Sequence, residues 1–194
     1  MRSSLPKLVA SVAVVGAAAA IAGLGTFATF TSSTSASHTI ASGTLTLTAP
    51  SSRLGTGASP IAAGDTMQRG IDLNYAGSIA FSAVTLTTSA SPSSLLDADT
   101  ANGLQLAMDK CSVAWTESGP PYTYTCGGTT SSVLASSPLV GSNIALSNLT
   151  LTAGATDHLR ATITFPTAAG NTLQNQSSTL TYAFVGTQRA GQSQ

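Results

Sequence analysis

Residues able to carry out metal-dependent or hydrolytic chemistry are scarce in this chain. Its two histidines, His38 and His158, lie 120 positions apart. There is no HExxH sequence, which would put two zinc ligands and a general base on one helix face, and no GxSxG sequence, which holds a serine nucleophile at a sharp turn. His158 falls on the polar side of an alternating segment, so we expect a solvated surface residue. The sequence therefore predicts neither an enzyme nor a bound cofactor.

The acidic residues give equally weak signals for catalysis or metal binding. Glu117 lies beside a Gly-Pro-Pro sequence, and we expect it to flank a turn rather than act as a general base. Asp65, Asp97 and Asp99 could contact a calcium ion, but their spacing does not match an EF-hand loop. No metal-binding residue is predicted.

The two cysteines, Cys111 and Cys126, lie on either side of a Ser-Gly-Pro-Pro turn at residues 118–121. Two cysteines in an exported chain indicate one disulfide. A loop of this length would stabilise the fold by roughly 3 kcal/mol through its effect on the unfolded chain. A redox or metal-binding pair is the alternative, but the CxxC spacing and companion ligands are missing.

Three aromatic residues, Trp115, Tyr122 and Tyr124, lie near the same turn. Exposed aromatic rings can bind sugars, as in a cell-surface adhesin. The interpretation we favour is that these rings pack a hairpin onto the rest of the fold, because aromatic side chains bury large apolar areas.

The composition limits the kinds of protein that this chain can be. Charged residues make up 7% of it, against roughly 25% in an average soluble protein. Losing Arg2 and Lys7 with an export segment would leave five basic residues against seven acidic ones. Nucleic acid is therefore not an expected partner.

The N-terminus has the pattern of a secretory signal peptide. A short basic segment, residues 1–7, precedes an apolar run of mostly Ala, Val and Gly at residues 8–24. Cleavage is expected after Ala28 or after Thr29, so that the mature chain begins at Thr29 or Phe30. An uncleaved membrane helix is the alternative. We expect an exported protein, secreted or at the cell surface, with no stable membrane anchor after processing.

Period-two alternation of apolar and polar residues predicts about eight strands and an all-β fold, a jelly-roll-like two-sheet β-sandwich behind the cleaved signal peptide. Turns are expected at 64–66 and 75–78, a β-bulge between Phe81 and Val84, and one helical turn at 94–99. The expected strands are 43–49, 67–73, 79–88, 104–117, 122–126, 143–152, 158–165 and 178–188.

Four parts of the chain follow from this pattern. Residues 1–29 form the signal peptide, 30–42 a polar N-terminal arm, 43–190 the β-sandwich and 191–194 a C-terminal tail. The arm is a candidate donor strand for another subunit, because a sheet edge has unpaired backbone groups that an extra strand satisfies. A disordered terminus is the alternative.

Three groups of residues together resemble the TasA/camelysin family of exported biofilm-matrix proteins. The match has three departures: Ala63 replaces the proline of the family's turn, Asn74 is displaced from the usual Asn just before Gly-Ser, and residues 104–142 lie outside the motifs. The groups are GTFATF at 25–30 with TIASGTL at 39–45, then Gly64-Asp65-Thr66 with Arg69 and GSIAF at 77–81, and finally Asn171, Gln174 and LTYAFVGTQR at 180–189.

The resemblance implies a jelly-roll subunit of extracellular fibres, in which the arm of one subunit inserts as a strand into the next. Phe30 and Ile40 are the expected apolar anchors of the arm. The implied partners are further copies of the chain, a SipW-type signal peptidase and, optionally, an accessory matrix protein. Two alternatives stay open, a secreted camelysin-like metallopeptidase and a cell-surface adhesin.

Overall fold

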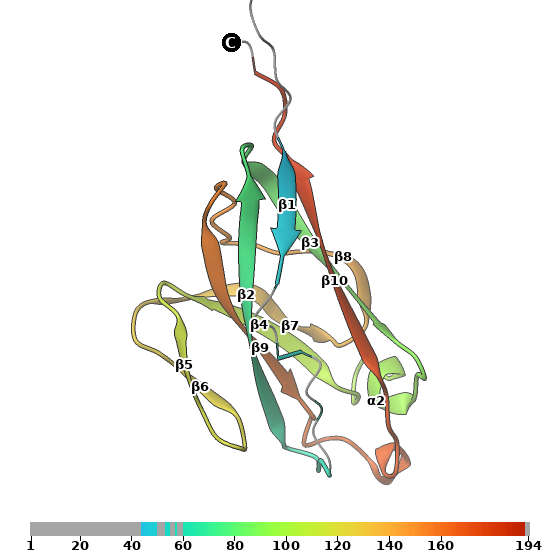
Figure 1. Cartoon of the computed structure of the whole chain (residues 1–194). Helices are drawn as coiled ribbons and strands as arrows, with labels where there is room; N and C mark the ends of the chain where they lie inside the picture. The colour runs from blue at the N-terminus through green and yellow to red at the C-terminus, as the bar shows by residue number, and fades with distance from the viewer. Residues whose placement is uncertain (1–43, 50–52, 55–56, 58–59, 193–194) are drawn as a thin grey trace, which may run out of the picture. The chain divides into compact units, whose positions relative to one another are not determined.

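The computed structural model describes residues 44–49, 53–54, 57 and 60–192. Within these ranges the chain forms ten strands, one short α-helix and one 3-10 helix (Figure 1). These elements are β1 (Leu45–Thr48), β2 (Thr66–Gly77), β3 (Phe81–Ala90), α2 (Leu95–Ala98), β4 (Gln105–Cys111), β5 (Trp115–Ser118), β6 (Thr123–Cys126), β7 (Thr130–Pro138), β8 (Gly141–Ala145), β9 (Thr156–Thr164), the 3-10 helix Asn171–Leu173 and β10 (Leu180–Gln188).

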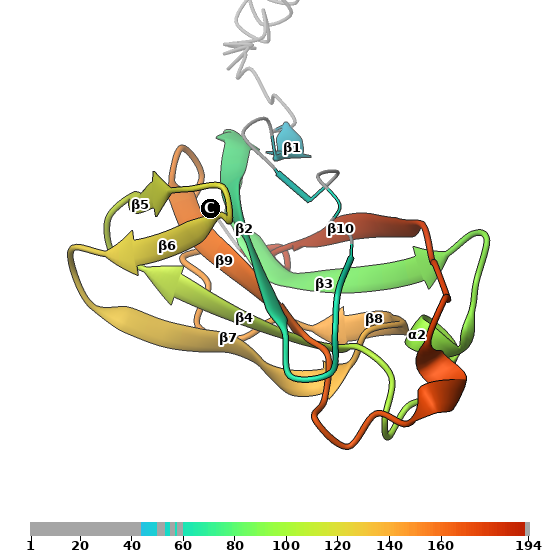
Figure 2. The same ribbon diagram turned by 90° about the horizontal axis from the view of Figure 1, so that it is seen from below.

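The strands form two principal sheets that face each other, and every pairing is antiparallel (Figure 2). One sheet has the strand order β1-β2-β9-β4-β7 and the other the order β10-β3-β8. A separate hairpin of β5 and β6 lies beside the larger sheet. The predicted all-β, two-sheet sandwich is confirmed.

The core lies between the two sheets, and strand alternation supplies its residues. In β9, Leu159, Ala161 and Ile163 are buried while the residues between them are not, as the period-two pattern predicts. The other strands contribute in the same way. The fully buried members include Ile71, Leu73 and Tyr75 of β2, Val84 and Leu86 of β3, and Leu106 and Met108 of β4.

Two local predictions are also confirmed. The register between β3 and β10 shifts because Thr187 pairs with Ala83 and Gln188 with Phe81, which leaves Ser82 as the extra residue of a β-bulge. The expected helical turn is α2, where Ser94 and Asp97 form a capping box at the N-terminus.

The predicted turn at 75–78 is wrong at its first three residues, since β2 continues to Gly77. Tyr75 is 1% exposed and its hydroxyl donates a hydrogen bond of 2.6 Å to Asp157. A Tyr-Ala-Gly-Ser sequence indicates a turn, but here burial of the ring and a satisfied hydroxyl favour the strand.

The predicted strand at 143–152 is wrong beyond Ala145, where β8 ends. Asn148 and Leu151 have φ angles of 55° and 59°, in the left-handed region that extended strands rarely adopt. The expected continuous strand at 104–117 is instead divided between β4 and β5. β7 was not predicted, because its Ser-rich sequence has few apolar residues to reveal an alternation.

Candidate functional site

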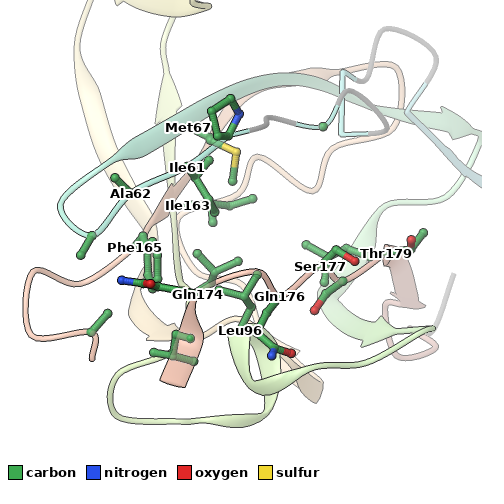
Figure 3. A pocket seen from close by; sticks show the side chains of 18 of the residues that line it. Ile61, Ala62, Met67, Leu96, Ile163, Phe165, Gln174, Gln176, Ser177 and Thr179 are labelled. Atoms are coloured by element: carbon green, nitrogen blue, oxygen red, sulfur yellow. The ribbon is translucent and has the colours of Figure 1, made fainter. Parts of the chain in front are cut away.

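A cavity of about 830 Å³ lies at the end of the sandwich where β2 and β10 begin (Figure 3). Its volume is within the roughly 300–1,000 Å³ of typical ligand clefts. We call it the seam groove, because it runs between one strand of each sheet. Met67 and Arg69 of β2 form one wall, and Leu180 and Tyr182 of β10 form the other.

The seam groove exists because β1 is much shorter than β2. β1 pairs only with residues 74–77 of β2. On that same edge, residues 66–73 of β2 have no strand partner within the described part of the chain, while β9 occupies the opposite edge. The amide of Arg53 donates one hydrogen bond of 3.1 Å to the carbonyl of Gly70 on this edge. The seam between the sheets is therefore closed by a strand only near the end of β2.

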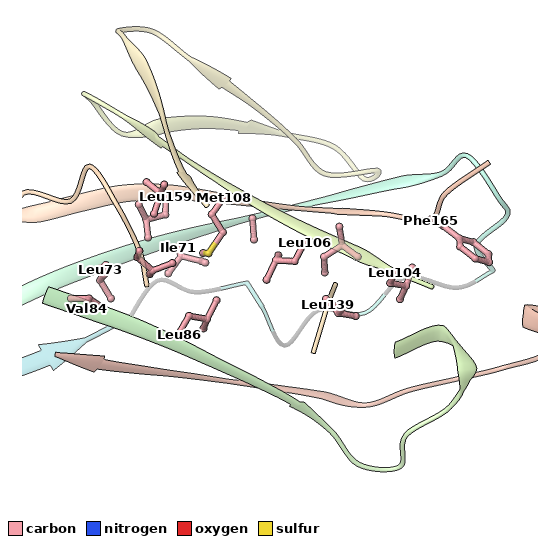
Figure 4. Packing of buried hydrophobic residues seen from close by; sticks show 14 of the residues in the cluster. Ile71, Leu73, Val84, Leu86, Leu104, Leu106, Met108, Leu139, Leu159 and Phe165 are labelled. Carbon is pink, nitrogen blue, oxygen red and sulfur yellow. The ribbon is translucent and has the colours of Figure 1, made fainter. Parts of the chain in front are cut away.

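The floor of the seam groove is apolar and continuous with the core. Ile163 and Phe165 are 5% and 7% exposed, and Leu104 lies beside them (Figure 4). Leu96 and Leu173 complete the floor from the two short helices. An apolar floor between two sheet edges suits an extended segment whose alternate side chains are apolar.

One rim of the seam groove is polar. The segment 174–179, which leads into β10, lines it with amide and hydroxyl side chains, and Gln174, Gln176, Ser177 and Thr179 are visible in Figure 3. These groups donate and accept hydrogen bonds without carrying charge. The site therefore provides an apolar floor and neutral hydrogen-bonding groups along one side.

Arg69 places a guanidinium in the wall of the seam groove. The residue is 5% exposed, and it donates hydrogen bonds to the carbonyl oxygens of Gln68 at 2.7 Å and Gly57 at 3.0 Å. Its guanidinium also lies 5.7 Å from the ring centre of Tyr122. Across the groove, burial raises the pKa of Tyr182 to about 12, so its hydroxyl stays protonated at neutral pH.

The direction of β1 fixes where the preceding residues join the sandwich. Leu45 pairs with Gly77 and Thr48 with Asn74, so β1 begins at the end of β2 that is farthest from the seam groove.

The β5–β6 hairpin carries the aromatic residues that the sequence singled out. Trp115 donates its Nε1–H to the carbonyl of His158 at 2.9 Å, and the guanidinium of Arg160 lies 4.5 Å from its ring. Tyr124 is 7% exposed and packs over Gly70. These contacts agree with the expectation that the aromatic residues pack the hairpin onto the sheet.

The disulfide between Cys111 and Cys126 is present, as predicted, and joins the end of β4 to the end of β6. Glu117 accepts hydrogen bonds from the Tyr124 hydroxyl and from Arg53 Nε, each at 2.6 Å. The bond from Tyr124 and the charge of Arg53 lower the pKa of Glu117, which suits an ion pair and not a general base.

His158 is not the solvated residue that the sequence predicts. Its side chain is 26% exposed, and Nδ1 lies 2.6 Å from a carboxylate oxygen of Asp72 on the neighbouring strand. The pairing follows from the register of β2 with β9, which puts Asp72 directly opposite His158.

The described residues do not fit a catalytic zinc ion. Within these residues no group of three histidine, cysteine or acidic side chains is close enough to hold a metal. Asp65 and Asp99 accept hydrogen bonds from nearby backbone amides, and Asp97 caps α2. Each carboxylate is therefore engaged in its own turn or helix end.

Several residues singled out in the sequence lie outside the described ranges. They are Ala28, Thr29 and Phe30 at the expected cleavage site, the second expected anchor Ile40, and His38. The seam groove itself was not predicted. Its only trace in the sequence is that the alternating segment before Pro50 is shorter than the one that follows residue 64. No helix within the described ranges is long and apolar enough to cross a membrane.

Comparison with protein families agrees with this picture. The model described as camelysin metallo-endopeptidase matches residues 5–114, which is more than half of the 194-residue chain. The match includes β1, β2 and therefore one wall of the seam groove, and it ends just before β5. No curated protein matches the sequence. With its signal-like N-terminus and all-β sandwich, the chain belongs to the TasA/camelysin family.

Proposed function

We propose that the protein is a secreted, non-enzymatic structural subunit of extracellular fibres, assembled by insertion of the N-terminal arm of one subunit into the seam groove of the next. The observation that carries this proposal is the groove itself, an apolar cleft between two sheet edges. An inserted strand would lie along the edge of β2 at residues 66–73, where no strand of the described chain pairs with it, as β1 does farther along.

The sequence of the arm is complementary to this groove. Phe30 and Ile40 are an even number of positions apart, so in a strand both side chains point to the same face. In a strand the two side chains would lie roughly 33 Å apart, so one of them would meet the apolar floor formed by Ile163 and Phe165. Residues 30–42 contain no Asp, Glu, Lys or Arg, so insertion buries no unpaired charge from the arm, with His38 neutral.

Donation between subunits, and not within one, is favoured by the direction of β1. The arm joins β1 at the Gly77 end of β2, whereas the seam groove lies beside residues 66–73. A head-to-tail contact between identical molecules extends into a filament when its rotation does not close a ring. Signal removal by a SipW-type peptidase would free the arm, and the mass of the secreted protein would identify Thr29 or Phe30 as its first residue.

Electron microscopy of three purified proteins tests the proposal. The mature protein is expected to form fibres, and a version that lacks residues 29–42 is expected to stay monomeric. Replacing both anchors, Phe30→Ser with Ile40→Ser, should also prevent fibres. The matched control replaces two polar arm residues, Thr31→Ser with Thr39→Ser, and should keep them. Fibres from the version without the arm would contradict the proposal.

A metallopeptidase is the second candidate, because the family model that matches the chain is described as a metallo-endopeptidase. Zinc-dependent cleavage of a protein substrate by the purified chain, abolished by His158→Ala, would favour a metallopeptidase over a structural fibre subunit.

A further inference from the structure

The charged residues of the described strands are distributed unequally between the sheets. The three-stranded sheet of β10, β3 and β8 contains no Asp, Glu, Lys or Arg in any of its strands. All seven charged residues of the described strands lie in β2, β4, β5 and β9. They are Arg69, Asp72, Asp109, Lys110, Glu117, Asp157 and Arg160.

The outer surface of the three-stranded sheet is made of short, neutral side chains. We call it the neutral face. In β3, Val84 and Leu86 point into the core, so Ala83, Thr85 and Thr87 point outward. In β10 the outward residues are exposed, and Val185 is 54% exposed. Cross-strand pairs across this face are Thr181 with Ser89, Ala183 with Thr87, Val185 with Thr85, and Thr187 with Ala83.

A sheet surface of this kind has little to prevent contact with an identical one. Like charges on protein surfaces keep soluble proteins apart. Two neutral faces can meet without like-charge repulsion and without burying an unpaired charge. Their short side chains also allow the backbones to come within the spacing of about 10 Å that is typical of stacked sheets.

The size of the neutral face indicates how it would be used. Strands of ten, nine and five residues (β3, β10 and β8), about 4.8 Å apart, give a face of roughly 400 Å² on each copy. Two such faces bury about 800 Å² in total, less than the 1,200 Å² or more of a stable pair. A single contact is therefore too weak to hold a dimer, but many contacts along two rows of linked subunits add up.

We propose that the neutral face is a lateral contact between identical fibres, in which it meets the same face on subunits of a neighbouring fibre. The inference rests on the proposed fibre assembly, and it adds a second, weaker interface to the seam groove. β10 lines the groove with Leu180 and Tyr182, which point inward, while Ala183 and Val185 lie on the outer face. Strand insertion therefore leaves the neutral face exposed at every subunit of a fibre.

The test places like charges on the neutral face. The variant Ala183→Lys with Val185→Lys adds two positive charges to exposed positions of β10. Its matched control, Ser132→Lys with Ala135→Lys, adds the same charge to exposed positions of β7, at the edge of the other sheet. Electron microscopy should show bundles for the mature protein and the control, and single fibres for the β10 variant. High salt should restore its bundles, because it screens exposed charges.

A second variant, Ala183→Glu with Val185→Glu, keeps the test decisive if the lysine variant does not fold. When both fold, a mixture of lysine fibres and glutamate fibres should form bundles that neither forms alone. Bundling of the β10 variants to the same extent as the mature protein would overturn the inference while leaving the fibre proposal intact. Single fibres without bundles from the mature protein would also overturn the inference and leave the fibre proposal intact. Absence of fibres from the mature protein would contradict the fibre proposal itself, and this inference with it.

Discussion

At the scale of single residues, Asp157 is a buried polar side chain with several partners. It is 2% exposed and accepts hydrogen bonds from the Tyr75 hydroxyl, the Thr150 amide and the Thr150 hydroxyl, at 2.6 to 2.8 Å. Lys110 Nζ lies 3.3 Å away. Burial alone would raise the pKa of Asp157, but the hydrogen bonds from Thr150 and Tyr75 and the charge of Lys110 lower it. The carboxylate therefore stabilises the fold in its ionised form.

Replacing Asp157 tests this account. Asp157→Ala should lower the free energy of unfolding by about 3–5 kcal/mol, because Lys110 and three donors lose their buried partner. Asp157→Asn keeps the shape and one acceptor, so its loss should be smaller. The measurement is urea unfolding at several pH values.

The lowered pKa of Asp157 determines how its contribution to the stability of the fold changes with pH. Because the pKa of Asp157 is lower in the folded protein, its contribution is full above the unfolded value and is lost as the pH falls through the folded one. The difference between the original protein and Asp157→Asn should therefore be largest near neutral pH and shrink in acid. A difference that grows as the pH falls would contradict this account.

The disulfide supports a second prediction at the residue scale. Cys111 and Cys126 are 15 positions apart, so replacing both by serine should cost about 3 kcal/mol of unfolding free energy. Adding a reductant to the original protein should lower its stability to the same level, and should leave the serine variant unchanged. Equal stability of the original protein with and without reductant would count against a stabilising bond.

At the scale of elements, the β5–β6 hairpin depends on one glycine beneath it. A Cβ atom at Gly70 would lie 2.8 Å from Cε1 of Tyr124, closer than van der Waals contact allows. The hydroxyl of Tyr124 donates a hydrogen bond to Glu117, and its backbone amide donates one to the side-chain oxygen of Gln68. The ring of Tyr124 thus holds the hairpin over β2, and it fits there because Gly70 below it has no side chain.

Gly70→Ala should therefore lower the unfolding free energy by roughly 1–3 kcal/mol, the usual cost of overpacking. The control is Gly170→Ala, where no atom lies within 4 Å of the added Cβ and little change is expected. Fluorescence of Trp115, the single tryptophan of the chain, reports on the hairpin directly and should shift only in the first variant. Unchanged fluorescence and stability in Gly70→Ala would refute the packing role of Tyr124.

Individual elements also show how far sequence reasoning reaches. The alternation of residues 158–165 predicted β9 and its buried face correctly, because each side chain obeys the period of the strand. The same pattern missed β7, whose Ser-rich segment is held by pairing with β4 and not by apolar alternation. The local pattern also predicted a turn at Tyr75, because Asp157, the hydrogen-bond partner of its hydroxyl, lies 82 positions away in the sequence. The local sequence pattern carries no information about interactions between distant parts of the chain.

At the scale of the whole molecule, the seam groove is such a long-range feature. It arises because β1 covers only residues 74–77 of β2, and because β10, more than 100 positions later, forms the other wall. No local pattern contains that combination. The sequence predicts the arm as a donor strand, and the proposed assembly makes the groove its acceptor.

The most direct test of strand donation uses two complementary variants. The donor keeps the arm but has Met67→Trp, which puts a large side chain into the wall of the groove; Met67→Leu, similar in volume, is its control. The acceptor lacks residues 29–42 and keeps its groove. Thermal unfolding confirms that each variant is folded.

The measurement is analytical ultracentrifugation of the donor, the acceptor and their mixture. Strand donation predicts that each variant alone is monomeric, that the mixture contains a one-to-one complex, and that the Met67→Leu control polymerises by itself. Assembly of the Met67→Trp donor alone, or a mixture that stays monomeric while the Met67→Leu control polymerises, would contradict insertion of the arm into the seam groove.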